Sequence, residues 1–250
     1  MKKLLILFLF TLSLGCSEDE FVNSYGTQFL RIDYQEDDRT WAEVYHYQAD
    51  GQLAQVEDFR SLGWRYELEY QDTVLRRVFT YEIASNALGR RDSMTYTSDG
   101  QLDVIYIFSG SPGEVLSLDI RYDYDYGSLS KVVSRQTYYR EDSVPRWLDR
   151  YYWEGEQIRR SEHYNEEDGL DYEVEYTYDQ QKNYLKMVPP HLYDPVNWGA
   201  NNVTIASLSD YTGLIDASCY RCVTTYRYNQ DGYPVEILKD WGLRLRLTYE

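Results

Sequence analysis

Histidine, cysteine and recognisable catalytic motifs are scarce in this chain of 250 residues, which holds three His and three Cys. His46, His163 and His191 are scattered along the sequence, and no motif places a nucleophile or a carboxylate against any of them. No Gly-x-Ser-x-Gly, His-Glu-x-x-His or phosphate-cradling loop is present. We therefore expect a protein that is not an enzyme and that uses no cofactor.

Basic residues are also in deficit. Lys and Arg number 25 against 42 Asp and Glu, which gives a net charge of −17 at pH 7. A surface this negative repels phosphate backbones and anionic lipid head groups, so we expect no nucleic-acid partner. Adjacent acids such as Asp37-Asp38 arise by chance at this composition, and none has EF-hand spacing, so we expect no metal site.

Long apolar runs are missing except at the N-terminus. Lys2 and Lys3 precede the apolar residues 4–14, a run shorter than the ~20 residues of a membrane-spanning helix. Gly15-Cys16 follows and resembles a bacterial lipobox, in which lipid is attached to the cysteine. We predict that residues 1–15 are a lipoprotein signal peptide and that Cys16 is the lipidation site. The alternative is a plain secretory signal cleaved nearby.

An acidic segment separates Cys16 from the rest of the chain. Residues 16–27 include Glu18, Asp19 and Glu20 and are typical of a solvated tether. The same acids resemble the export signal that carries lipoproteins of the Bacteroidota to the outer face of the outer membrane. We expect an exported protein that contacts the outer membrane through its lipid alone, on the periplasmic side or at the cell surface.

Tyrosine, in contrast, is abundant, with 28 residues, and it recurs in a phrase of the form Tyr-x-Tyr-x-x-Asp-Gly. The clearest copies are residues 45–53, 94–102 and 226–234, the second with Met at the first aromatic position. Each copy reads as strand, tight turn, strand, because Gly accepts the positive φ that such turns require. The predicted turn anchors are Asp50, Gly51, Asp99, Gly100, Asp231 and Gly232.

Weaker copies fill most of residues 28–250, with turns that recur every 22 to 28 residues. Such a period with two strands per unit is a repeat signature, and alternation of polar and apolar residues dominates throughout. We predict a single all-β domain, an antiparallel meander of about seven to eight β-hairpin repeats. A sheet of fourteen to sixteen strands should curl into a strongly curved sheet or a partly closed barrel.

One segment interrupts the repeat. Residues 184–188 read as a strand that ends at Pro189-Pro190, and residues 189–222 are predicted to be a long loop insertion. Residues 203–208 could form a short strand within it. Long loops carry function or shield the end of a core, and both alternatives are open here.

The phrase Tyr-x-Tyr-x-x-Asp-Gly-x-Leu resembles the YD repeat of RHS-type proteins. Together with the lipobox and the last unit at residues 226–234, the chain is similar to YD-like lipoproteins of unknown function in Bacteroidota. The resemblance covers most of residues 28–250 and implies an array of β-hairpins. It brings no catalytic residue with it.

Two cysteines near the C-terminus, Cys219 and Cys222, are close enough in sequence to bond to each other. In an exported protein we expect a structural disulfide that closes a tight loop. A redox role would require the pair at the start of a helix, and a zinc site would require two further ligands.

Aromatic side chains are the remaining candidates for binding. Six Trp and the Tyr ladders could form a platform for sugar rings, although cross-strand aromatic packing explains them equally. Trp198, in the predicted loop, is the Trp that we expect to be exposed for ligand contact. Thr73, Ser93 and Ser143 each follow an Asp and precede an apolar residue, which resembles an O-glycosylation site of Bacteroidota or simply marks a turn.

These observations predict a lipoprotein anchored to the outer membrane that acts as a non-catalytic binding or interaction module. Two alternatives are open: a glycan-binding accessory protein that uses aromatic faces, and a structural component of the envelope or of adhesion. The partner would be a glycan or a protein.

Overall fold

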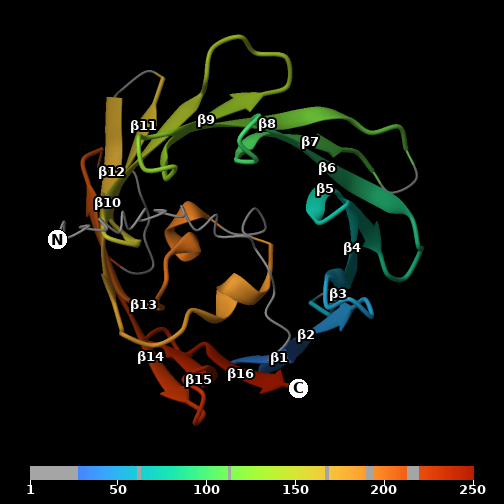
Figure 1. Ribbon diagram of the computed structural model, residues 1–250, viewed down its shortest axis with the longest axis vertical. Coiled ribbons are helices and arrows are strands. Elements are labelled where there is room, and N and C mark those ends of the chain that lie inside the picture. Colours follow the sequence, from blue (N-terminus) through green and yellow to red (C-terminus); the bar gives the residue numbers. More distant parts are fainter. Residues whose placement is uncertain (1–27, 61–62, 112–113, 167–168, 190–193, 213–219) are drawn as a thin grey trace, which may run out of the picture.

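The computed structural model describes residues 28–60, 63–111, 114–166, 169–189, 194–212 and 220–250. Sixteen antiparallel strands in sequence order form one closed barrel (Figure 1). The strands are β1 Phe29–Glu36, β2 Arg39–Tyr47, β3 Leu53–Asp58, β4 Trp64–Gln71, β5 Val74–Glu82, β6 Leu88–Tyr96, β7 Leu102–Ser109, β8 Ser117–Tyr126, β9 Val132–Tyr139, β10 Trp147–Glu154, β11 Gln157–Asn165, β12 Gly169–Tyr178, β13 Val203–Asp210, β14 Arg221–Tyr228, β15 Pro234–Lys239 and β16 Arg244–Tyr249.

The predicted all-β meander is confirmed, but the barrel closes completely. Strand β1 pairs with β16 over almost its full length, from Phe29 opposite Tyr249 to Gln35 opposite Arg244. Every strand therefore has two hydrogen-bonded neighbours, and the sheet has no free edge at which another chain could add a strand.

The two ends of the barrel differ. The turn rim carries the Asp-Gly turns, and the loop rim at the opposite end carries connections such as 37–38, 83–87 and 240–243. At the turn rim, Gly51, Gly100 and Gly232 have φ of +84°, +80° and +82°, each directly after its predicted Asp. The described chain also begins at this rim, because the Gln28 side chain donates to the carbonyl of Gly51.

A β-bulge lies at the start of the second strand of each phrase, and it explains the three-residue spacing of the first two buried residues of that strand. Tyr96 lies opposite Leu102, whereas Met94 lies opposite Ile105, so β7 holds one extra residue. Leu102 and Ile105 therefore both face inward although they are three residues apart, and both are buried. The same one-residue shift in strand register occurs between each equivalent aromatic residue and the residue before it, at Tyr47, Tyr70, Tyr126, Trp153, Tyr178 and Tyr228.

The second aromatic residue of the phrase ties neighbouring hairpins together. The Tyr96 hydroxyl donates to the carbonyl of Leu75, the residue that starts the inward face of the preceding hairpin, at 2.6 Å. Equivalent bonds run from Tyr70 to Leu53, Trp153 to Val132, Tyr178 to Ile158 and Tyr249 to Pro234. In the last phrase it is the first aromatic residue, Tyr226, that donates to a carbonyl, that of Val203. Five tyrosine hydroxyls and one indole N–H thus satisfy backbone carbonyls at the turn rim.

The segment between β12 and β13 enters the barrel from the turn rim and lies inside it (Figure 1). It contains two short 3-10 helices, η1 Tyr184–Met187 and η3 Pro195–Trp198. The strand predicted over residues 184–188 is therefore wrong, because the buried Asn183 side chain accepts from Leu185 N–H and caps a helical turn instead. Within the described residues, no helix is long and apolar enough to cross a bilayer.

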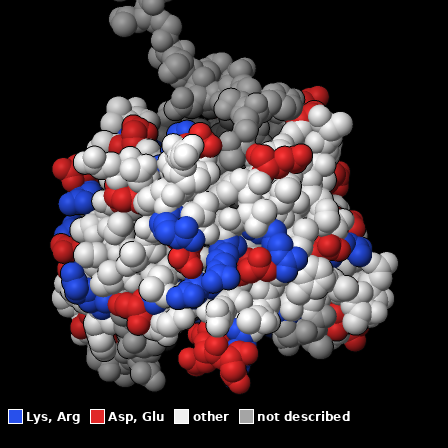
Figure 2. All heavy atoms as spheres, turned by 90° about the horizontal axis from the view of Figure 1, so that it is seen from below, with Lys and Arg blue, Asp and Glu red and all other residues white. Residues whose placement is uncertain are grey.

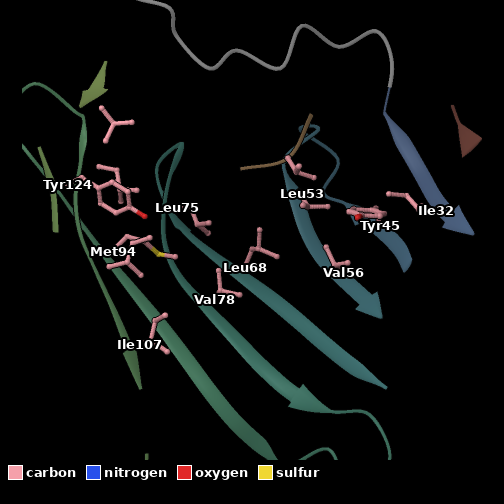
Figure 3. Packing of buried hydrophobic residues seen from close by; sticks show 14 of the residues in the cluster. Ile32, Tyr45, Leu53, Val56, Leu68, Leu75, Val78, Met94, Ile107 and Tyr124 are labelled. Atoms are coloured by element: carbon pink, nitrogen blue, oxygen red, sulfur yellow. The ribbon is translucent and has the colours of Figure 1, made fainter. Parts of the chain in front are cut away.

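The insertion lies between β12 and β13 rather than at the predicted residues 189–222, and the short strand expected at residues 203–208 is the full barrel strand Val203–Asp210. The core lies between this insertion and the inner face of the wall. Leu68, Val78 and Met94 lie together on the inner side of neighbouring strands (Figure 3). Leu185, Val196 and Trp198 of the insertion pack against the same cluster.

Candidate functional site

The outward face of the wall is built from charged pairs. Residues that alternate with the buried ones carry opposite charges within ion-pair distance at mid-strand positions. Arg121 lies 2.9 Å from Asp123 on β8, and Arg77 lies 3.0 Å from Glu69 across β4 and β5. Further outward pairs are Arg31–Asp33, Arg65–Glu67, Arg160–Glu162 and Arg227–Glu236.

Arginines also cover several aromatic rings of the outward face. The guanidinium of Arg121 lies 3.8 Å from the ring centre of Tyr138, which is only 7% exposed. Comparable stacks join Arg91 with Phe108, Arg150 with Tyr164, Arg160 with Tyr152 and Arg65 with Tyr81. These rings already have a cationic partner, so they do not form a bare platform for sugar stacking.

The inward face carries a buried charged network on β9–β12. Arg135 faces inward at the position that Ile105 occupies in the preceding hairpin, since Tyr124 pairs with Arg135 as Met94 pairs with Ile105. Its guanidinium contacts Asp149 at 2.8 Å and Asp194, the residue that precedes η3, at 3.3 Å. The start of η3 is thereby held to the wall by charge.

Histidine 163 belongs to the same network. Its Nδ1 lies 2.7 Å from the carboxylate of Asp149, and its ring stacks on Tyr172 with 4.7 Å between centroids. Burial alone would raise the pKa of Asp149, but the hydrogen bond from His163 and the charge of Arg135 hold it below its ordinary value. Burial raises the pKa of Asp194, and Arg135 only partly opposes this effect.

A second inward network lies near the loop rim on β2, β3 and β6. Arg60 contacts Asp58 at 2.7 Å and Glu43 at 3.3 Å, and Arg90 contacts Asp92 at 2.6 Å. Burial raises the pKa of Glu43. The interior therefore changes along the barrel axis from aromatic and aliphatic at the turn rim to charged toward the loop rim.

A groove of about 430 Å³ lies on the wall over β16, β1 and β2. Arg31, Arg244 and Arg246 line it, with Asp33 as the sole acidic side chain in the lining. Phe59, which is 48% exposed, borders the groove from the connection that follows β3. Gln35, Thr40, Ala42, Tyr34 and Trp41 complete the lining.

The predicted ligand contact at Trp198 lies inside the barrel. Its ring packs against Tyr124 at 5.9 Å between centroids, and it joins the hydrophobic core. Trp198 is half-buried there, with its neighbours Pro195 and Gly199 buried. A role of this side chain in ligand binding stays a prediction, and the position differs from the exposed loop that we expected.

The other predicted residues are dispersed. Thr73 lies in the exposed β4–β5 turn, Ser93 lies on β6 and Ser143 lies in the exposed β9–β10 connection. Cys222 lies on β14, whereas Cys16 and Cys219 lie outside the described residues, so lipidation and the disulfide stay predictions. Of these residues, the described ones, Thr73, Ser93, Ser143 and Cys222, lie outside the charged networks and the groove lining.

The charged networks escaped the sequence-based prediction, although a signal for one of them exists. The alternation on β10 puts Asp149 on the same face as the buried Tyr151, which marks a charged residue directed inward. The groove has no comparable signal, since β1 and β16 meet only when the barrel closes.

Comparison with known proteins identifies a structure with a similar fold but does not assign the chain to a family. No family model matches the chain, and no curated protein matches it. A porin-like protein from Bacteroides uniformis is similar over 89% of this chain and 98% of its own, with 12% identity and a TM-score of 0.56.

Two further solved structures have lower scores. A porin-like protein from Bacteroides vulgatus has 14% identity, covers 90% of this chain and 99% of its own, and has a TM-score of 0.41. A chain of the Photorhabdus luminescens Tc holotoxin pore has 13% identity over 80% of this chain and 13% of its own, with a TM-score of 0.26. Of these three, the first alone supports a shared fold.

Proposed function

We propose that this protein is a lipid-anchored, non-catalytic binding module whose barrel stands in water beside the outer membrane. The observation that carries the proposal is the charged outward face of the wall. A membrane-spanning barrel has the opposite polarity, with an apolar band outside and a polar interior.

The energetic cost supports a wall in water. An arginine on the lipid-facing side costs roughly 2–4 kcal/mol at the bilayer midplane. Arg77, Arg121 and Arg160 all lie on the outward face, together with their acidic partners. Burying several such residues in lipid would cost on the order of 10 kcal/mol. In water the same ion pairs stay hydrated and carry no such desolvation penalty.

The repeat geometry supports kinship with YD-type hairpin proteins. A bulge beside the second aromatic residue and a hydroxyl bond to the preceding hairpin recur around the barrel. Both features assign a structural task to the residues of the phrase. A YD-like lipoprotein would then reach the membrane through the lipid on Cys16 and a tether of residues 16–27, without a spanning segment.

A non-catalytic role is consistent with the arrangement around His163. Asp149 is shared between His163 and Arg135, and Arg135 also contacts Asp194, so each charge faces an opposite charge. This network holds the start of η3 to the wall. We propose that it stabilises the fold and that binding takes place on the water-exposed surface.

Replacement of Cys16 tests the proposal. In cells supplied with labelled palmitate, the native protein should take up label and enter the detergent phase on phase separation. The Cys16→Ala variant, expressed without residues 1–15 so that the apolar run 4–14 cannot hold it in the membrane, should carry no label and should be recovered from the aqueous phase with an unchanged β-sheet circular dichroism spectrum. A folded Cys16→Ala variant that stays in the detergent phase would contradict a wall in water.

A further inference from the structure

The groove over β16, β1 and β2 concentrates positive charge on an acidic protein. Acids outnumber bases by 42 to 25 in the whole chain, yet the groove lining holds three Arg and one Asp. A band of Lys and Arg side chains crosses this side of the barrel (Figure 2). The balance of charged side chains in the groove lining is therefore the reverse of that in the whole chain.

Two arginines of the groove, Arg244 and Arg246, are incompletely neutralised. Glu236 is the shared partner of Arg227 at 3.2 Å, Arg244 at 3.7 Å and Arg246 at 3.8 Å. One carboxylate thus faces three guanidiniums, and the last two distances exceed those of a hydrogen bond. The N–H groups of Arg244 and Arg246 are therefore placed to donate to a bound anion, in the planar fork that matches a carboxylate.

The surroundings of these donors restrict the ligand. Phe59 offers an aromatic ring at the border of the groove, and Gln35 and Thr40 offer exposed polar groups. The volume of about 430 Å³ falls in the range of small-molecule sites. A ligand with one carboxylate for the arginines, a ring for Phe59 and hydroxyls for Gln35 and Thr40 matches these side chains.

Other anionic partners fit less well. An extended acidic peptide gains affinity by adding a strand to a sheet edge, and this closed barrel has none. Lipid head groups lie on the side of the tether, which joins the barrel at the turn rim, whereas Gln35, Thr40 and Arg244 lie toward the loop rim. A long polyanion is repelled by the net charge of the chain.

We propose that the groove binds an acidic sugar, a uronic acid unit of a glycan, with its carboxylate on Arg244 and Arg246 and its ring against Phe59. This inference rests on the proposed function and names the ligand class of the binding module. It also moves the glycan site from the inward-packed Trp198 to the outer wall.

Titration calorimetry on the full lipidated chain in detergent tests the site. The probes are trimers of galacturonic, glucuronic and mannuronic acid, with neutral galactotriose as the matched control. We expect at least one uronate trimer to bind and galactotriose to bind at least tenfold more weakly. Affinity for the uronate should fall as salt increases, because the contact is ionic.

Variants locate the site on the wall. Arg244→Gln and Arg246→Gln should each weaken uronate binding at least tenfold, and Phe59→Ala should weaken it severalfold. Arg77→Gln is the matched control, since Arg77 is an outward arginine on β5, and it should bind as the native chain does. Thermal unfolding of each variant verifies that the barrel is intact.

Four results would overturn the inference: no binding of any uronate trimer, equal binding of galactotriose, unchanged affinity in both groove variants, or a matching loss in Arg77→Gln. Binding of phosphatidylglycerol vesicles that is lost only in the groove variants would assign the groove to lipid instead. A dimer lost only in these variants would assign it to a second copy of the chain. If the Cys16→Ala variant is folded and aqueous while uronate binding fails, the proposed function stands without this ligand.

Discussion

On β7, Ile105 and Ile107 face the interior and are each 4% exposed, whereas on the neighbouring strand β8 Arg121 and Asp123 face outward and pair at 2.9 Å. The two faces of one wall thus have the polarity of a protein in water. A porin-like neighbour shares the fold, but fold alone does not decide which side of a barrel meets lipid. Under our proposal the alternating side chains indicate a wall in water, and mutations on the two faces should therefore differ in cost.

The largest difference in stability between the two faces should appear when the inward Arg135 is compared with an outward arginine. The Arg135→Ala variant leaves the buried Asp149 and the half-exposed Asp194 without their cation, so we expect a loss of about 3–5 kcal/mol in the free energy of unfolding. Urea denaturation measures it. The outward Arg77→Ala variant removes a half-exposed pair and should lose only ~0.2–1 kcal/mol. Equal losses in the two variants would erase the distinction between the faces.

Apolar residues on the two faces should also differ in how much their replacement lowers the free energy of unfolding, by a somewhat smaller amount than the charged residues do. Ile105→Ala opens a cavity in the inner layer and should cost about 2–5 kcal/mol in the free energy of unfolding. Val133→Ala, at a residue that is 39% exposed on β9, should change it by less than about 0.5 kcal/mol. Denaturation midpoints of the two variants give the comparison, and a larger loss at Val133 would reverse our assignment of the faces.

The tyrosine bonds of the turn rim should contribute less than the core. Tyr96→Phe keeps the ring but leaves the Leu75 carbonyl without its hydroxyl donor, so we expect a loss of roughly 1–3 kcal/mol. Tyr106→Phe on the outward face of β7 is the control and should be near neutral. Thermal unfolding separates the two variants. Similar stabilities would mean that the repeated hydroxyl bond does not stabilise the barrel.

The same tyrosines predict how stability depends on alkaline pH. Burial raises the pKa of Tyr96 from its ordinary 10.0 to about 12. Because the folded state favours the protonated form, its contribution is complete below pH 10 and is lost as the pH rises through about 12. Unfolding followed between these values should show this loss, and the Tyr96→Phe variant should show less of it. A flat profile would contradict the buried position of the hydroxyl.

The sequence was sufficient for the strand content and for the turns, because Tyr, Asp and Gly recur with a period that only hairpins satisfy. It did not reveal closure, since the pairing of Phe29 with Tyr249 joins residues at opposite ends of the domain. It also mistook residues 184–188 for a strand, because the apolar residues Tyr184 and Leu185 pack against the core from a helical turn. Local patterns do not distinguish these two ways of burying a side chain.

The candidate sites were harder to predict for the same reason. Asp149 and His163 come together because the β10–β11 register places them opposite each other, and Asp194 reaches Arg135 only through the path of the insertion. The groove joins β1 and β16, which are adjacent only after closure. Alternation could have marked Asp149 as inward, but no pattern in the sequence pairs it with Arg135.

The polarity of the wall is tested most directly by a probe on its outward face. A nitroxide is attached to Arg121→Cys in the lipidated chain, with Cys219 and Cys222 changed to Ser, and the protein is placed in liposomes. Our account predicts collisions with a water-soluble paramagnetic reagent and few with lipid-dissolved oxygen. High oxygen accessibility with little access from water would show that position 121 faces lipid, and the account would be contradicted.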